Sequence, residues 1–257
     1  MVGTSRAAAA SSSPTGTPAE SPTESPSETT SPTATETETE CSIPDKFAGQ
    51  DVEVLPVEDK LIALTFDAGA NADGVPSIRD TLQRKKVKAT FFLTGSFAKT
   101  YPVKSQRLAA RDLVGNHTMT HLDLTTLSDE RVTRQVRNAE GTIRSTTGQD
   151  PRRFFRFPKG ARNDHLIGLL NDLCYVPFRW TVDTLGWKGT SGGQSKASVV
   201  ARVMAAAKPG AIVLMHVGSN PKDHTTLDAD ALPTIITKLR DLGYHFVRLA
   251  RVMSSAP

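Results

Sequence analysis

The sequence predicts an α/β fold: a distorted barrel of seven to eight strand–helix units, in one domain behind a disordered N-terminal tail. Two observations lead to this prediction. The composition changes abruptly near residue 43, and beyond it short apolar runs alternate with segments of helical periodicity. Such alternation is typical of parallel sheets covered by helices, and residues 44–257 are enough for one α/β barrel.

The tail, residues 1–43, consists mainly of Ala, Ser, Thr, Pro, Gly and Glu and has no aromatic residue. It cannot bury enough apolar surface to offset its conformational entropy, so we expect a disordered stalk or linker. Arg6 precedes only four alanines, which is too short for the apolar segment of a signal peptide. We therefore expect the secretion signal or membrane anchor to lie upstream of this start.

Seven short apolar runs predict the strands. After the first run, Val75, Ile78 and Leu82 stand at helical spacing, and a longer helix follows Ser128, a favourable N-cap. The expected strands are residues 61–66, 89–93, 113–116, 153–157, 175–182, 211–215 and 245–249, and the later helices are expected at 166–173, 196–203 and 232–242.

The net charge of +4 conceals a more basic domain, because the tail has six glutamates and one arginine. A basic surface favours an anionic polymer, although it is equally compatible with an ordinary soluble surface. Since no basic run is interleaved with aromatic residues, we expect no nucleic-acid partner. We also expect a monomer with no membrane span, because no apolar window reaches the roughly 20 residues that a transmembrane helix needs.

The two cysteines, Cys41 and Cys174, are too few for a disulfide framework and lack the spacing of a metal site. They could form one disulfide in an oxidising compartment. A buried free thiol at Cys174 is equally compatible with its apolar neighbours.

Polar residues stand at the ends of five predicted strands. In a β/α barrel, the strand ends and the loops that follow them meet at one face, where reactive residues gather. A set of carboxylates, imidazoles and a guanidinium at that face predicts a hydrolytic site. These residues are Asp67, His117, His121, Arg156, Asp183 and His216.

His117 and His121 are four positions apart, a spacing that would place both imidazoles on one side of a helical turn. This geometry suits a divalent metal ion. The same spacing occurs on ordinary polar helix faces, but the other strand-end groups favour a metal site here.

Five segments that contain these residues resemble, in order, the motifs of the polysaccharide deacetylase family, also called the NodB-homology domain or carbohydrate esterase family 4. Each motif is weak alone, but five in order at strand ends are specific, and the resemblance spans residues 60–249. It implies a distorted β/α barrel. The segments are TFDAG (65–69), HTMTH (117–121), RFPKG (156–160), DTLGW (183–187) and LMH (214–216).

The resemblance implies a role for each residue of the metal side of the site. Asp67 would be the general base that activates water, and Arg156 would orient it and keep it ionised. His117 and His121 would bind a divalent metal ion, which we expect to be Zn²⁺.

On the opposite side, the resemblance implies that His216 is the general acid and Asp183 its carboxylate partner. Leu214 and Trp187 would form apolar walls around the acetyl methyl group, and Lys159 would contact the substrate. An amide suits such a site, because its carbonyl needs a Lewis acid and its amine must be protonated to leave.

Ala68 departs from the family pattern, which has a second aspartate there as the third metal ligand. The third ligand could instead be Asp67 itself, Asn71 or Asp73 from the following loop, or water. We favour Asp67 in contact with the metal, with water completing the coordination.

Two further departures affect the substrate side. Lys159 stands where the family has an aromatic residue, which would favour anionic or lactyl-bearing sugars. Gly186 stands where many members have a second aspartate before the tryptophan.

The leading expectation is a metal-dependent hydrolase that removes N-acetyl groups from amino sugars of a cell-wall polysaccharide, such as peptidoglycan or a chitooligosaccharide. An O-acetyl esterase acting on xylan stays open, because the same chemistry permits it. So does an inactive, wall-binding pseudoenzyme, although the retained acid and base residues argue against it. The expected partner is an acetylated polysaccharide, and the expected location is extracellular, at the cell wall.

Overall fold

The computed structural model describes residues 43–253. Most of the predicted tail, residues 1–42, lies outside the described residues, as does Cys41. Cys174 is half-buried and disulfide-bonded, so the free thiol is not found. Within the described part, no helix combines the length and the apolar character that a membrane crossing requires.

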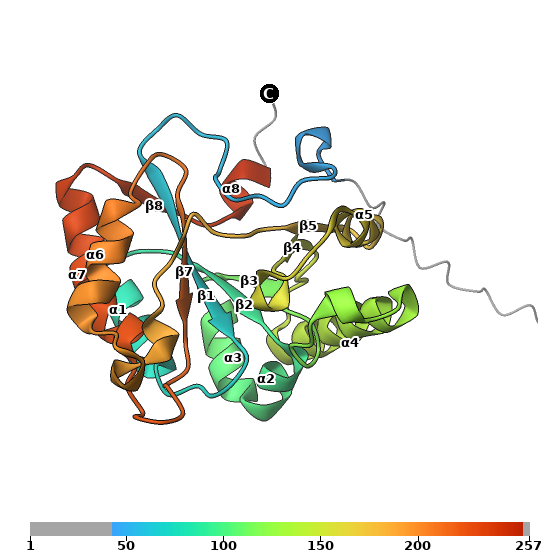
Figure 1. Cartoon of the computed structure of the whole chain (residues 1–257), viewed down its shortest axis with the longest axis horizontal. Helices are drawn as coiled ribbons and strands as arrows, with labels where there is room; N and C mark the ends of the chain where they lie inside the picture. Colours follow the sequence, from blue (N-terminus) through green and yellow to red (C-terminus); the bar gives the residue numbers. More distant parts are fainter. Residues whose placement is uncertain (1–42, 254–257) are drawn as a thin grey trace, which may run out of the picture. The chain divides into compact units, whose positions relative to one another are not determined.

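A curled parallel sheet, half of a barrel, forms the centre of the described domain (Figure 1). The strand order is β5-β4-β3-β2-β1-β7-β6, and β8 pairs with the first residues of β1. The expected α/β barrel architecture is thus confirmed. The strands are β1 (Leu61–Ala68), β2 (Thr90–Leu93), β3 (Leu113–Asn116), β4 (Arg153–Phe155), β5 (Tyr175–Pro177), β6 (Val182–Asp183), β7 (Ile212–His216) and β8 (His245–Val247).

The single strand expected at 175–182 is wrong, since this segment forms two short strands at opposite ends of the sheet. The backbone changes partners along the run. The Arg179 N–H donates to the Val52 carbonyl, and the Thr181 N–H donates to the Ile212 carbonyl, both at 2.8 Å. This segment therefore carries the chain from one edge of the sheet to the other.

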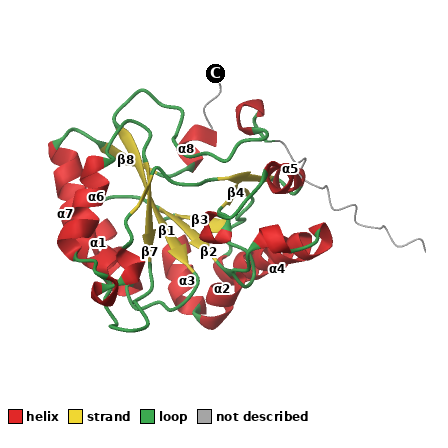
Figure 2. Cartoon of the chain, viewed as in Figure 1, coloured by secondary structure: helices red, strands yellow, loops and turns green. Residues whose placement is uncertain are grey.

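Helices flank the sheet in two groups (Figure 2). α7 packs against α1 and α6, and α4 packs against α2 and α3. The predicted apolar stripes are buried, including Ile78 of α1 and Val136 of α4. The helices are α1 (Val75–Arg84), α2 (Gly95–Thr100), α3 (Pro102–Ala109), α4 (Asp129–Thr147), α5 (Asp164–Asp172), α6 (Lys196–Ala205), α7 (Leu227–Asp241) and α8 (Ala250–Met253).

Strand register brings polar residues from distant parts of the chain to one edge. Asp67 of β1 lies opposite His216 of β7, and Asn116, which ends β3, lies opposite Phe155 of β4. Because the strands are parallel, their carboxyl ends and the loops after them share this edge. The candidate site lies there.

Candidate active site

The buried centre of the site is Arg156, which is fully excluded from solvent. Its Nε donates to the Phe178 carbonyl at 2.9 Å and its Nη2 to the Arg179 carbonyl at 2.8 Å. Its Nη1 donates to Thr65 Oγ1 and to Asp67 Oδ1, both at 2.9 Å. A guanidinium held by so many partners has one orientation, and it imposes that orientation on the carboxylate that it binds.

Asp67 is buried and uses its two oxygens differently. Oδ1 accepts from Arg156, whereas Oδ2 lies 3.4 Å from His117 Nε2. Burial raises the pKa of this carboxyl, but His117 and the Arg156 guanidinium outweigh burial and hold the pKa below its usual range. Asp67 is therefore ionised at neutral pH, with Oδ2 directed at the histidine pair.

His117 is also buried, and its Nδ1 lies 2.8 Å from the carbonyl oxygen of Arg156. That contact requires the Nδ1–H tautomer, so Nε2 presents a lone pair toward Asp67. Burial lowers the pKa of His117 to about 4, which keeps the imidazole neutral. A neutral histidine fixed through its other nitrogen is the usual arrangement of a metal-binding imidazole.

The helical turn expected at 117–121 is wrong, because these residues form a loop. Thr118 and His121 have positive φ angles of 66° and 60°. The His121 N–H donates to Thr118 Oγ1 at 3.1 Å, and the His117 and His121 ring centroids lie 4.7 Å apart. The two imidazoles thus come together through left-handed backbone rather than through helical spacing.

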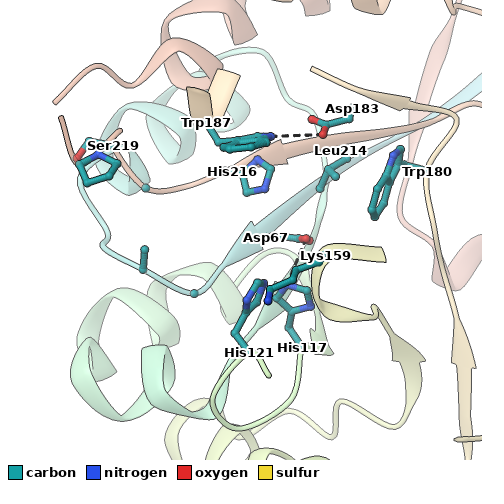
Figure 3. A pocket seen from close by; sticks show the side chains of 14 residues that line it. Asp67, His117, His121, Lys159, Trp180, Asp183, Trp187, Leu214, His216 and Ser219 are labelled. Carbon is teal, nitrogen blue, oxygen red and sulfur yellow. Dashed lines mark hydrogen bonds and ion pairs between the residues drawn. The ribbon is translucent and has the colours of Figure 1, made fainter. Parts of the chain in front are cut away.

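These donors fit a divalent metal ion in part. His117 Nε2 and Asp67 Oδ2 face the same space, and His121 lies beside them (Figure 3). Among residues 43–253, however, no three such side chains already stand at metal-binding distances from a common point. Asp67, His117 and His121 are thus the candidate ligands, although they are not arranged as a complete metal site.

Two of the expected substitutes for the third ligand are committed elsewhere. Asn71 Oδ1 accepts from the Ser219 N–H at 2.8 Å, and its Nδ2 donates to the Ser219 carbonyl at 3.1 Å. Asp73 Oδ2 accepts from Ser219 Oγ at 2.6 Å. These bonds tie the loop after β1 to the loop after β7, and they leave Asp67 as the carboxylate beside the histidines.

Across the site, the expected pairing of His216 with Asp183 is not found. Asp183 Oδ1 accepts from the Leu185 N–H at 2.8 Å, and its Oδ2 lies 3.4 Å from Trp187 Nε1 (Figure 3). Asp183 therefore holds the 183–187 turn and orients Trp187. The carboxylate in ion-pair contact with the His216 imidazole belongs to Asp228 of α7, 3.7 Å from Nδ1.

Burial lowers the pKa of His216, but neighbouring carboxylates outweigh burial and raise it above its usual value. These carboxylates are Asp228, Asp67 and Asp183. His216 is accordingly disposed to hold a proton on the side of the site opposite the two metal-side histidines (Figure 3).

An open cavity of about 570 Å³ lies between these two sides. Trp187 is 46 % exposed, with its ring 6.3 Å from that of His216, and it forms one wall. Trp180 forms another, packed so closely on Gly160 that a Cβ there would lie 2.8 Å from the indole. The lining residues are Asp67, Gly69, Ala70, His117, His121, Lys159, Trp180, Asp183, Trp187, Leu214, His216, Gly218, Ser219 and Pro221.

All of the predicted site residues except Arg156 line this cavity, and Arg156 lies buried beneath Asp67. The sequence alone did not identify Thr65, Trp180 or Asp228. Thr65 is one residue from the predicted strand end, and Trp180 is an aromatic residue in a polar stretch, so both had weak signals.

A model of the polysaccharide deacetylase family matches residues 55–178. The peptidoglycan-N-acetylglucosamine deacetylase of Bacillus cereus is 31 % identical over 202 residues, which cover 78 % of this chain and 71 % of that protein.

Two solved structures are similar in fold. The Bc1960 peptidoglycan N-acetylglucosamine deacetylase has a TM-score of 0.72 at 30 % identity, over 80 % of this chain and 93 % of that one. BA3943 of Bacillus anthracis, a CE4 family pseudoenzyme, has a TM-score of 0.69 at 32 % identity, over 76 % and 66 %. The chain belongs to the polysaccharide deacetylase family of carbohydrate deacetylases.

Proposed function

We propose that this protein is a metal-dependent N-deacetylase of cell-wall amino sugars and that it acts at the cell wall. The observation that carries the proposal is the opposition of two groups across one cavity. An ionised Asp67 beside two imidazoles lies on one side, and a proton-holding His216 lies on the other. Amide hydrolysis needs a base and an acid in this relation.

His117 and His121 would hold the metal ion, with Asp67 Oδ2 as the nearest carboxylate oxygen. A bound divalent metal, Zn²⁺ by our proposal, polarises a substrate carbonyl and makes water a nucleophile near neutral pH. The fixed tautomer of His117 supports this assignment, since Nδ1 is committed to the Arg156 carbonyl.

Asp67 accepts the proton of the attacking water, and Arg156 keeps the carboxylate oriented for that transfer. His216 donates a proton to the departing amine from Nε2, because Nδ1 faces Asp228. Leu214 and Trp187 give the acetyl methyl group an apolar surface between these two groups.

Lys159 favours peptidoglycan over a neutral polymer. Its side chain lines the cavity beside the imidazoles, and its positive charge lowers the pKa of His121 after the larger effect of burial. An ammonium group at that position attracts a carboxylate such as the lactyl group of a muramic acid residue. Peptidoglycan carries such groups and chitin does not.

The test is acetate release by the purified protein from peptidoglycan, from an N-acetylglucosamine oligomer and from acetylated xylan, with Zn²⁺ and after chelation. We expect metal-dependent release that is fastest from peptidoglycan. Release from xylan alone would instead identify an O-acetyl esterase. No release from any substrate, together with no bound zinc, would identify an inactive relative of the kind that BA3943 represents.

A further inference from the structure

Asp228 is a buried carboxylate in the first turn of α7, with only 3 % of its surface exposed. Its Oδ1 accepts from Thr184 Oγ1 at 2.6 Å, and its Oδ2 accepts from the backbone N–H of His216 at 2.9 Å. A carboxylate is costly to remove from water, so a buried one needs charged or hydrogen-bonding partners. Both oxygens of Asp228 find partners in or near the candidate site.

The remaining neighbour of Asp228 is the His216 imidazole. Oδ2 lies 3.7 Å from His216 Nδ1, within ion-pair distance but beyond a hydrogen bond. His216 Nδ1 is itself buried and has no hydrogen-bond partner. A small rotation of the ring would close this contact and satisfy both groups.

Gly186 leaves the space that Asp228 occupies. A Cβ at position 186 would lie 2.4 Å from Asp228 Oδ1 and 2.6 Å from its Cγ, so any side chain there would force the carboxylate of Asp228 or the loop to shift. Glycine at position 186 thus lets Asp228 keep its present place. The loop after β6 and the start of α7 are complementary at this point.

We propose that Asp228 is the positioning residue of His216: α7 inserts its carboxylate into the space beside Gly186 and fixes the imidazole with Nδ1–H toward Asp228 and Nε2 toward the cavity. The proposal rests on the proposed function for the role of His216 as proton donor. The other charged groups that face this imidazole are Asp67 of β1, Asp183 of β6 and His121 of the loop after β3.

The first experiment compares Asp228→Asn with Asp230→Asn, which alters an exposed aspartate in the same turn of α7. With zinc-loaded protein, we expect Asp228→Asn to lower kcat roughly 10- to 100-fold and to change KM little. In the pH profile of kcat, the alkaline limb of this variant should move to lower pH. Without the negative charge of residue 228, His216 releases its proton at a lower pH. Asp230→Asn should match the wild-type protein in all three respects.

The second experiment exchanges the two positions. Gly186→Asp alone should lose activity, because the new side chain collides with Asp228. Gly186→Asp combined with Asp228→Ala should regain at least about tenfold over Asp228→Ala alone, because the carboxylate returns to the same space from the other element. A double variant no more active than Asp228→Ala would overturn the proposal.

A third measurement does not depend on activity. The chain has six histidines, so the His216 imidazole can be followed by ¹⁵N-resolved NMR as pH is varied. Asp228→Asn should lower the pKa of His216, because it removes a neighbouring negative charge, and a titration curve that superimposes on that of the wild-type protein would refute the positioning role of Asp228. If the wild-type protein cleaves no substrate, the proposed function fails, yet this titration still decides whether Asp228 controls His216.

Discussion

At the scale of single residues, the site is organised around one buried ion pair. Arg156 and Asp67 are both nearly inaccessible to solvent, and the other side-chain hydrogen bonds of Arg156 go to backbone carbonyls and Thr65. Removing two charges from water is expensive, and the cost is recovered only when geometry and additional hydrogen bonds are good. The pair is therefore better explained by the orientation that it gives Asp67 than by a gain in stability.

Replacing one member of this pair should be severe. Arg156→Met leaves Asp67 charged and unpaired, so we expect the free energy of unfolding to fall by about 3–5 kcal/mol. Urea denaturation measures this loss. Arg144→Met removes an exposed pair with Asp150 and should cost less than about 1 kcal/mol. Equal losses in the two variants would contradict the account.

The buried His117 makes stability depend on pH in the metal-free protein. Its pKa is lowered from 6.5 to about 4, so between these values the unfolded chain binds a proton that the native state does not. Stability should therefore fall as pH decreases through this window, by up to about 1.4 kcal/mol per pH unit. Asp67, whose pKa is lowered from 3.8, changes the stability with pH only below this window.

Urea denaturation at several pH values between 4 and 6.5 would measure this effect as the difference between the wild-type protein and His117→Gln. In His117→Gln, the free energy of unfolding should depend less steeply on pH than in the wild-type protein. In His245→Gln, which alters an exposed residue, it should depend on pH as in the wild-type protein. Because other buried carboxyl groups are the same in all three proteins, they cancel in the comparison. The prediction fails if His117→Gln keeps the full wild-type slope.

Site residues in short motifs at strand ends could be predicted from the sequence. Site residues that reach the site only through packing between distant segments could not. Asp67, His117 and His216 each follow an apolar run. Asp228 stands in the first turn of a helix, where an aspartate is usually explained by the helix dipole. Its contact with His216 and its dependence on Gly186 become visible only when α7 packs beside β7.

At the scale of elements, alternating apolar runs and helical stripes were sufficient to predict the order of strands and helices. Two features required the folded chain. Residues 175–182 were predicted as one strand, because no local sequence signal indicates that the backbone hydrogen bonds change partner near Arg179. The 117–121 spacing reads as a helical turn, although Thr118 and His121 adopt positive φ.

The loop that carries the two imidazoles should depend on Thr118. Its Oγ1 accepts from the His121 N–H, and its own N–H donates to Asn116 Oδ1 at 2.8 Å. Thr118→Val keeps the shape but removes the acceptor, so His121 loses a fixed position and zinc affinity should fall about tenfold.

Competition with a chromogenic chelator measures this affinity. Thr120→Val, in the same loop, removes a hydroxyl that contacts Gln135 at an exposed position, and it should leave zinc affinity unchanged. Equal affinities for the wild-type protein and Thr118→Val would show that the threonine does not position His121.

At the scale of the whole molecule, a parallel sheet converts residues far apart in sequence into one site. β1 lies inside the sheet, and it pairs with β8 only through its first residues, so Asp67 near its carboxyl end is flanked by β2 and β7. The loop after β3 and the end of β7 then place the imidazoles of His117 and His121 and that of His216 on opposite sides of the cavity. With alanine at position 68, this arrangement offers two histidines and one carboxylate, and the proposed function makes that carboxylate the base.

The most direct test of the account is a zinc titration of chelated protein in which bound zinc and acetate release from peptidoglycan are measured together. The account predicts that both rise in parallel to one zinc per chain. Asp67→Asn should bind zinc, although more weakly, without activity, and His117→Ala should lack both. Full activity in the metal-free protein, or in Asp67→Asn, would contradict the central claim that Asp67 acts as the base beside a metal held by His117 and His121.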